Sequence, residues 1–153
     1  MFFNALRAAL LAAVMMGGAV FATASSSVSA DATPQPAAVK IAAIDGDAVY
    51  KGDFRGVEGK QATGSFEIFR DGDRTLIRLS DDFSLTRVPD PKLSFGNGAY
   101  VDGTTYALLT SFNGEQVYEI PSHLNPAAFS QVWIWCEEFS VPLAVAEIGP
   151  SAA

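Results

Sequence analysis

The sequence predicts an all-β fold, an antiparallel β-sandwich or barrel-like single domain of about eight strands, preceded by a cleaved signal peptide. Two observations carry this prediction. From Val39 onward, short runs of alternating or continuous apolar residues recur, and glycine, proline, asparagine and aspartate separate them. No long segment places its apolar residues at the 3.6-residue period of a helix.

The first 30 residues have the layout of a secretory signal peptide. Arg7 is their only charged side chain, residues 8–24 are almost wholly apolar, and Val28-Ser29-Ala30 forms a small-residue exit. The apolar run is short for a membrane anchor, which needs about 20 residues. We therefore expect cleavage after Ala30, export to the periplasm or the medium, and no membrane span in the mature chain.

The predicted organisation is a signal peptide over residues 1–30, a flexible lead-in with a candidate first strand over 31–44, and a β domain over 45–149. Removing 30 of the 153 residues leaves 123, enough for one domain with a hydrophobic core. Without Arg7, nine basic residues stand against 17 acidic ones, a formal net charge of −8. This balance argues against nucleic acid and anionic membranes as partners, because both are bound by clustered Lys and Arg.

The composition excludes several kinds of cofactor site within one chain. All three methionines lie in the signal segment, and the rest of the chain has one thiol, Cys136, and one imidazole, His123. A blue-copper site needs two histidines and a cysteine. Iron–sulfur clusters and structural zinc sites need more thiols or imidazoles, and no Cys-x-x-Cys-His motif for covalent haem is present. We therefore predict no metal site.

The first strands alternate in polarity. Residues 65–69 and 75–79 flank the turn Asp71-Gly72-Asp73 and predict a β-hairpin with one apolar face. Residues 83–88 alternate as well, and Pro89 ends that strand because proline lacks the backbone donor of the ladder.

The middle of the chain predicts three further strands. Residues 92–95 are brief and meet the glycine-rich turn 96–98, and residues 105–112 are more continuously apolar. Asn113-Gly114 is the strongest turn pair in the chain, and residues 116–120 are predicted to form the strand that follows this turn.

The last third begins with the one helical signal. Asn125 is placed to cap a short turn that has Pro126 at its first position. Residues 131–136 then predict the strongest strand, and residues 140–148 predict the last one.

The strand that ends at Cys136 is apolar on both faces, which predicts a central strand covered on both sides. Val132, Ile134 and Cys136 share one face, and Trp133 and Trp135 share the other. The two indoles have the shape to stack on a sugar or a haem, but their position within a strand favours packing in the core.

Polarity changes abruptly after Cys136, at Glu137-Glu138. We expect the strand to emerge there, through a bulge that turns Phe139 and Val141 inward. The thiol then lies at the boundary between core and surface. The two adjacent carboxylates disfavour a thiolate unless a lysine or arginine approaches from another strand.

The end of the chain resembles the DM13 domain family. In that family a Tyr-x-Ile-Pro stretch leads to an Ile-Trp-Cys-x-x-Phe-Ser-Val stretch, and the chain has both, at residues 118–121 and 134–141. Weaker matches follow the family's order upstream. They are Gly52–Phe54, Ala62–Phe69, Leu79–Phe83 and Pro89–Phe95. The resemblance covers about residues 45–149.

The resemblance implies an exported β-sandwich-like domain of a kind often found beside DOMON domains, with electron transfer or another redox step at Cys136. The cysteine would act as a bare thiol or hold a cofactor such as haem, with Trp135, Tyr118 and His123 as further cofactor-binding candidates. An electron-transfer or envelope protein is then the expected partner. The chain departs from the pattern at Lys60, where many relatives have histidine, and at residues 142–146, where relatives tend to have Phe-Gly-x-Ala.

Two other readings stand beside a redox module. The first is a non-catalytic envelope binding or structural module in which Cys136 is a small buried hydrophobe, a common role for free cysteine. The second is a cysteine hydrolase with His123 as the base. The position of this histidine in a predicted loop favours a surface side chain, so a module is expected rather than a turnover enzyme.

Overall fold

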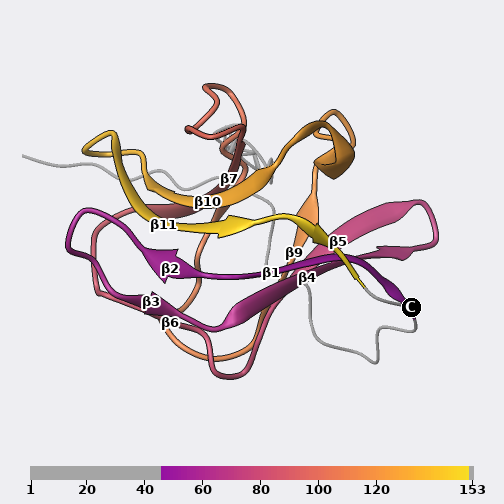
Figure 1. Ribbon diagram of the computed structural model, residues 1–153, viewed down its shortest axis with the longest axis horizontal. Coiled ribbons are helices and arrows are strands. Elements are labelled where there is room, and N and C mark those ends of the chain that lie inside the picture. Colours follow the sequence, from indigo (N-terminus) through magenta and orange to yellow (C-terminus); the bar gives the residue numbers. More distant parts are fainter. Residues whose placement is uncertain (1–45, 152–153) are drawn as a thin grey trace, which may run out of the picture. The chain divides into compact units, whose positions relative to one another are not determined.

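The computed structural model describes residues 46–151. The predicted signal peptide, residues 1–30, and the predicted lead-in, residues 31–44, lie outside this range. The described chain is all β apart from one short 3₁₀ turn, as predicted, and its strands form two five-stranded antiparallel sheets and one two-stranded ladder (Figure 1). Neither five-stranded sheet closes on itself, so the fold is a sandwich and not a barrel. Within residues 46–151 there is no helix with the length and apolarity to cross a membrane.

The first sheet has the strand order β12–β1–β4–β5–β9, and every neighbouring pair is antiparallel. Its strands are β1 (Ala48–Asp53), β4 (Ser65–Asp71), β5 (Arg74–Leu79), β9 (Gln116–Ile120) and β12 (Gly149–Pro150).

The second sheet has the order β2–β11–β10–β7–β8 and is also antiparallel throughout. Its strands are β2 (Arg55–Gly56), β7 (Pro91–Gly96), β8 (Ala107–Leu108), β10 (Gln131–Cys136) and β11 (Val141–Glu147). A small ladder of β3 (Ala62–Thr63) and β6 (Ser84–Leu85) completes the fold. Seven of the described strands have five or more residues and the others have two, which accounts for the prediction of about eight.

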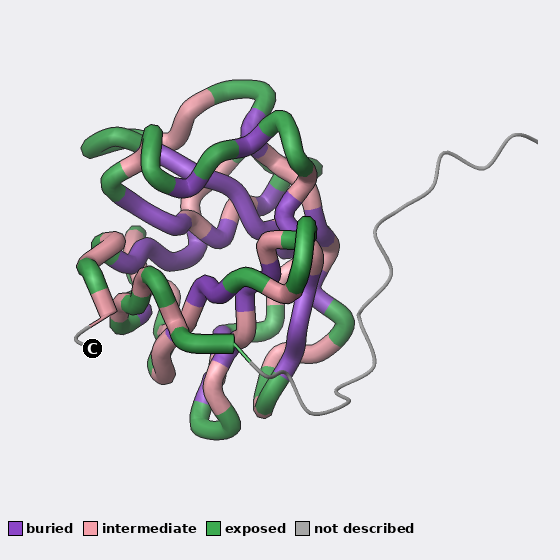
Figure 2. Tube along the Cα trace, turned by 90° about the vertical axis from the view of Figure 1, so that its right-hand side faces the viewer, coloured by how far each residue is buried: buried purple, intermediate pink, exposed green. Residues whose placement is uncertain are grey.

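One hydrophobic core lies between the two five-stranded sheets. Phe66 and Ile68 of β4 pair with Leu79 and Ile77 of β5, and all four side chains are fully buried, which confirms the predicted hairpin and its apolar face. The same core contains Cys136 and its neighbours from the second sheet. Burial follows the strands, while exposed residues gather in the connections (Figure 2).

Two middle strands are shorter than predicted. Of residues 83–88 only Ser84–Leu85 form a strand, and of residues 105–112 only Ala107–Leu108 do. The turn at Asn113-Gly114 does not close a hairpin, because β8 pairs with β7 in one sheet and β9 pairs with β5 in the other. The chain crosses between the sheets here.

Hydrogen bonds outside the named strands stabilise the segment that crosses between the sheets. The backbone N–H of Gly114 donates to the carbonyl of Phe83 at 2.9 Å, and the hydroxyl of Ser111 donates to the carbonyl of Asn113 at 2.7 Å. The short 3₁₀ turn η1 (Pro126–Ala128) is as predicted: the side chain of Asn125 accepts a hydrogen bond from the backbone of Ala127 at 3.1 Å.

Candidate functional site

β10 positions the candidate thiol at its last residue. The strand pairs with β7 on one side and β11 on the other, which confirms the prediction of a central strand. Val132, Ile134 and Cys136 point into the core and are buried. Cys136 is only 1% exposed, although the four residues that follow it are all exposed. The thiol therefore lies at the edge of the core, under the end of the sheet.

The surroundings of Cys136 come from both neighbouring strands. Pro91 of β7 and Val141 of β11 lie opposite it in register. Its Sγ donates a hydrogen bond to the carbonyl oxygen of Pro89 at 3.2 Å. Pro89 is 47 residues away in the chain, so no local pattern could have indicated this bond. The next residue, Asp90, has a φ of 47°, a left-handed conformation that is uncommon for a residue other than glycine.

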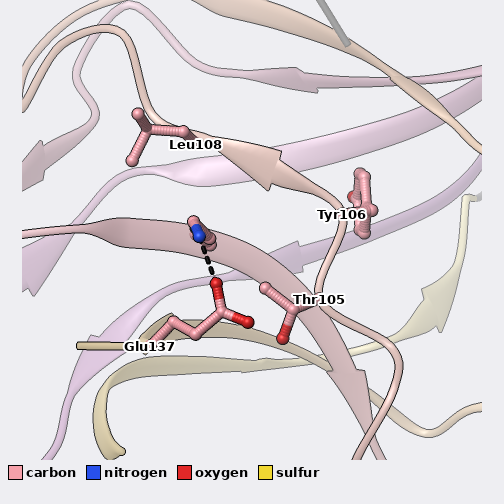
Figure 3. A pocket seen from close by; sticks show the side chains of 5 residues that line it. Thr105, Tyr106, Leu108 and Glu137 are labelled. Carbon is pink, nitrogen blue, oxygen red and sulfur yellow. Dashed lines mark hydrogen bonds and ion pairs between the residues drawn. The ribbon is translucent and has the colours of Figure 1, made fainter. Parts of the chain in front are cut away.

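A lysine does approach from another strand, but it is already paired. Lys92 of β7 forms an ion pair with Glu137 (Figure 3) and a second one, at 3.4 Å, with Asp90. The hydrogen bond that Lys92 donates to Glu137 raises the pKa of Lys92. Partial burial opposes this shift, and Asp90 adds smaller effects that also raise the pKa. Lys92 lies opposite Trp135 in register, on the outer face of the sheet, whereas Cys136 points to the inner face. The ammonium group of Lys92 therefore lies on the outer face beside the site and does not point at the thiol.

The hollow beside this ion pair measures about 160 Å³ and is lined by Lys92, Thr105, Tyr106, Leu108 and Glu137 (Figure 3). Cys136 is not among its lining residues. The volume is below the roughly 300–1,000 Å³ of small-molecule sites. With its thiol enclosed and bonded to Pro89, Cys136 does not fit a haem ligand in this arrangement.

The two tryptophans lie on the outer face of the second sheet and are partly exposed. The prediction that they pack in the core is wrong, because the second face of this central strand is covered only in part. Trp135 stacks on Tyr100 with ring centroids 4.1 Å apart and an interplanar angle of 8°. The indole N–H of Trp133 donates to the side-chain oxygen of Gln131 at 3.0 Å.

Tyr118, a cofactor-binding candidate, lies on β9 in the facing sheet, and β9 is not a neighbour of β10. It shares the hydrophobic core with Cys136. Its hydroxyl accepts from the backbone of Thr110 at 2.9 Å and donates to the side chain of Gln116 at 2.6 Å. Burial raises the pKa of Tyr118, and the bonds from Thr110 oppose that shift.

A second buried phenol, on Tyr106, was not singled out from the sequence, where it is one letter in an apolar run. Its ring is partly exposed and stacks on Phe95 with centroids 5.6 Å apart, but the hydroxyl oxygen is buried and has no hydrogen-bond partner among the described residues. Burial, and secondarily the nearby Tyr118, raise the pKa of Tyr106.

His123 is exposed in the turn between β9 and η1. That turn lies at one end of the second sheet and the connection after Cys136 lies at the other (Figure 1). β10 alone spans about 17 Å at roughly 3.4 Å per residue. His123 is therefore not placed to act as a base on Cys136. Residues 46–151 contain no group of three or more His, Cys, Asp and Glu side chains arranged to hold a metal ion.

The connection after Cys136 differs from the predicted bulge. Phe139 is 60% exposed and does not turn inward, while Val141 packs against the core as predicted. The irregularity lies in β11 instead, where Ile134 pairs with Ala144 and the next residue, Trp135, pairs with Pro142. Leu143 is the extra residue of β11 between these two pairs, and residues 137–140 form an exposed turn.

The fold and the site define a small antiparallel β-sandwich domain with one shielded thiol at the end of a central strand. A family model described as "Electron transfer DM13" matches residues 53–148 of this chain. The chain belongs to the DM13 family, and its domain is an electron-transfer domain by that family's description. Comparison with curated proteins and with solved structures gave no match.

Proposed function

We propose that this protein is an exported electron-transfer module in which Cys136 is the reactive atom. Export is inferred from the signal-like layout of residues 1–30. The single observation that carries the thiol's role is its placement: Cys136 is shielded in the core, yet it is the last residue before an exposed turn. An unpaired cysteine persists in an oxidising compartment when it is buried, ligated or used, and this position provides the shielding.

The chain restricts the chemistry that a lone thiol can perform. Cys136 is the only cysteine, so it forms no internal disulfide. Reaction with a partner disulfide is the simplest balanced step: Sγ loses its proton and bonds to one sulfur, the S–S bond breaks, and the leaving thiolate takes up a proton. The partner is then an envelope or electron-transfer protein.

The second candidate is a non-catalytic envelope module in which Cys136 fills the core. The observation that favours it is the nearly complete burial of the thiol, whose donor is already bonded to Pro89. A small buried hydrophobe with a weak S–H donor has the same appearance.

Thiol exchange measured in the folded protein separates the two candidates. The reduced protein is incubated with glutathione disulfide, and mass spectrometry follows the mixed disulfide at Cys136, first folded and then in denaturant. A redox role predicts modification of the folded protein that a reductant reverses, and none in Cys136→Ser. Modification only after unfolding supports the core-filler role. A visible spectrum of the purified protein reports any bound haem.

A further inference from the structure

Phe139 is the most exposed large apolar side chain in the described chain, at 60%, and Val49 at 40% is the other. It lies in the turn Glu137–Ser140, directly after the strand that carries Cys136. Single exposed apolar residues are common on protein surfaces and need no function. Phe139 differs in that it lies in a hydrogen-bonded turn among charged residues.

The turn is fixed at both ends. Ser140 has a φ of 51°, a conformation that non-glycine residues seldom adopt, and its backbone N–H donates to the carbonyl of Glu137 at 3.3 Å. Glu137 is in turn held by Lys92 of the neighbouring strand. These contacts favour one conformation of the turn, and preorganisation of this kind lowers the entropic cost of binding.

The surround of Phe139 is acidic. Glu137 and Glu138 precede it in the turn, and Asp90 joins them through the ion pairs that both Asp90 and Glu137 make with Lys92. This cluster therefore contains three carboxylates and one ammonium group. Glu138 is exposed and forms no ion pair within residues 46–151. The whole chain carries a formal net charge of −7, which adds a long-range field of the same sign.

We propose that the turn Glu137–Ser140 is the docking surface for a cationic electron-transfer protein, with Phe139 inserted in an apolar socket and Glu138 facing lysine or arginine. An aromatic anchor within a charged rim is the usual anatomy of a small interface, and complementary charge speeds the encounter. The inference rests on the proposed function of Cys136. Phe139 lies three positions after Cys136 in the chain, so the Cα atoms of the two residues are at most about 11 Å apart.

The test is an NMR titration of the ¹⁵N-labelled protein with a lysine-rich c-type cytochrome as probe. The same cytochrome with acetylated lysines serves as the charge control. We expect the amide signals of residues 137–140 to shift on binding, with an affinity that falls as salt screens the charges. The acetylated probe should bind at least about tenfold more weakly, because the charge attraction is lost.

Matched variants locate the surface. Phe139→Ala and Glu138→Lys should each raise the Kd at least about fivefold, because one removes the anchor and the other reverses a rim charge. Val49→Ala removes the other exposed apolar side chain. Asp73→Lys makes the same charge change in the β4–β5 hairpin, at the opposite end of the fold (Figure 1). Both controls should change the Kd less than about twofold.

Several results would overturn the docking proposal. They are the absence of saturable binding at low salt, signal shifts centred outside residues 137–140, equal weakening by Glu138→Lys and Asp73→Lys, or dimerisation of the protein through Phe139 without the probe. Cys136→Ser separates this proposal from the proposed function. If that variant binds the probe normally while the folded wild-type thiol proves inert, docking stands and the thiol's role fails.

Discussion

The thiol of Cys136 donates a hydrogen bond to the main-chain carbonyl of Pro89, with the two atoms 3.2 Å apart. This contact joins the end of β10 to the segment that leads into β7. Lys92 clamps the same two segments from the outer face, through Asp90 on one side and Glu137 on the other. A reagent can therefore reach the thiol only when these two segments separate. The free energy of this local opening sets the rate at which Cys136 reacts in the folded protein.

Replacing Cys136 should lower stability by an amount that depends on the new side chain. Cys136→Ala removes a fully packed sulfur and should reduce the free energy of unfolding by about 1–2 kcal/mol. Cys136→Ser keeps a donor for the Pro89 carbonyl and is expected to cost no more than the alanine variant. Urea denaturation of the three proteins measures both values. An unchanged midpoint for Cys136→Ala would show that the sulfur is not closely packed.

Lys92→Met should expose the thiol more than it destabilises the fold. The Glu137 carboxylate is more than half exposed, so solvent screens the pair and its loss should cost at most about 1 kcal/mol. Labelling of the folded Cys136 by a small thiol reagent should become several-fold faster, because the clamp on its two flanks is gone. Arg74→Met breaks an exposed ion pair with Asp71 in the distant β4–β5 hairpin and serves as control. Equal labelling rates in both variants would contradict the clamp.

The same lysine predicts a pH effect on stability. The pKa of Lys92 in the folded protein is raised above 10.5, mainly by its hydrogen bond to Glu137. A raised folded-state pKa means that its contribution is fully present below pH 10.5 and is lost as pH rises through the folded value. Wild type should therefore lose stability more steeply than Lys92→Met as the pH rises above 10.5 in urea melts. Parallel pH curves would argue against the pair in solution.

The two buried tyrosines should respond in opposite directions to loss of the hydroxyl. The Tyr106 oxygen is buried and has no hydrogen-bond partner within residues 46–151, so Tyr106→Phe should stabilise the protein by about 1 kcal/mol at neutral pH. Tyr118→Phe removes bonds to Thr110 and Gln116 and should destabilise it by about 1–2 kcal/mol. Thermal and urea unfolding of the two variants test this pair of signs. A destabilising Tyr106→Phe would indicate that an unseen water bonds the hydroxyl.

Tyr106 also predicts alkaline sensitivity. Burial raises the pKa of Tyr106 above its usual 10.0, so the neutral phenol belongs to the folded state. Its contribution is present below pH 10.0 and is lost as pH rises, because the unfolded chain ionises first. Tyr106→Phe should flatten the fall in stability above pH 10.0, as measured by urea melts at successive pH values. Tyr50→Phe, at a partly exposed ring, is the matched control.

The stack of Tyr100 on Trp135 gives a spectroscopic prediction. Tyr100→Ala uncovers one face of the indole and should move tryptophan emission to longer wavelength, with a loss of about 0.5–1.5 kcal/mol of stability. Tyr100→Phe keeps the stacking ring and loses only the hydroxyl contact with Thr105, so its emission should match wild type. An unchanged spectrum in the alanine variant would contradict the stack.

The sequence alone determined the fold class, the hairpin of residues 65–79, the capped turn at Asn125, the central position of residues 131–136 and membership of the DM13 family. These features depend on local signals, namely alternation of polarity, turn residues and helix caps. Each of these signals is carried by residues that lie close together in the sequence.

Only the tertiary structure decided how the candidate site is assembled. It placed Tyr118 in the facing sheet, His123 at the far end and Phe139 in solvent, and it brought Lys92 to Glu137 and Pro89 to the thiol. Strand order sets these contacts, and partners 45 or 47 residues apart leave no periodic mark in a single sequence. The register shift between β10 and β11 is the clearest case, since it changes which residues of the two strands lie opposite each other.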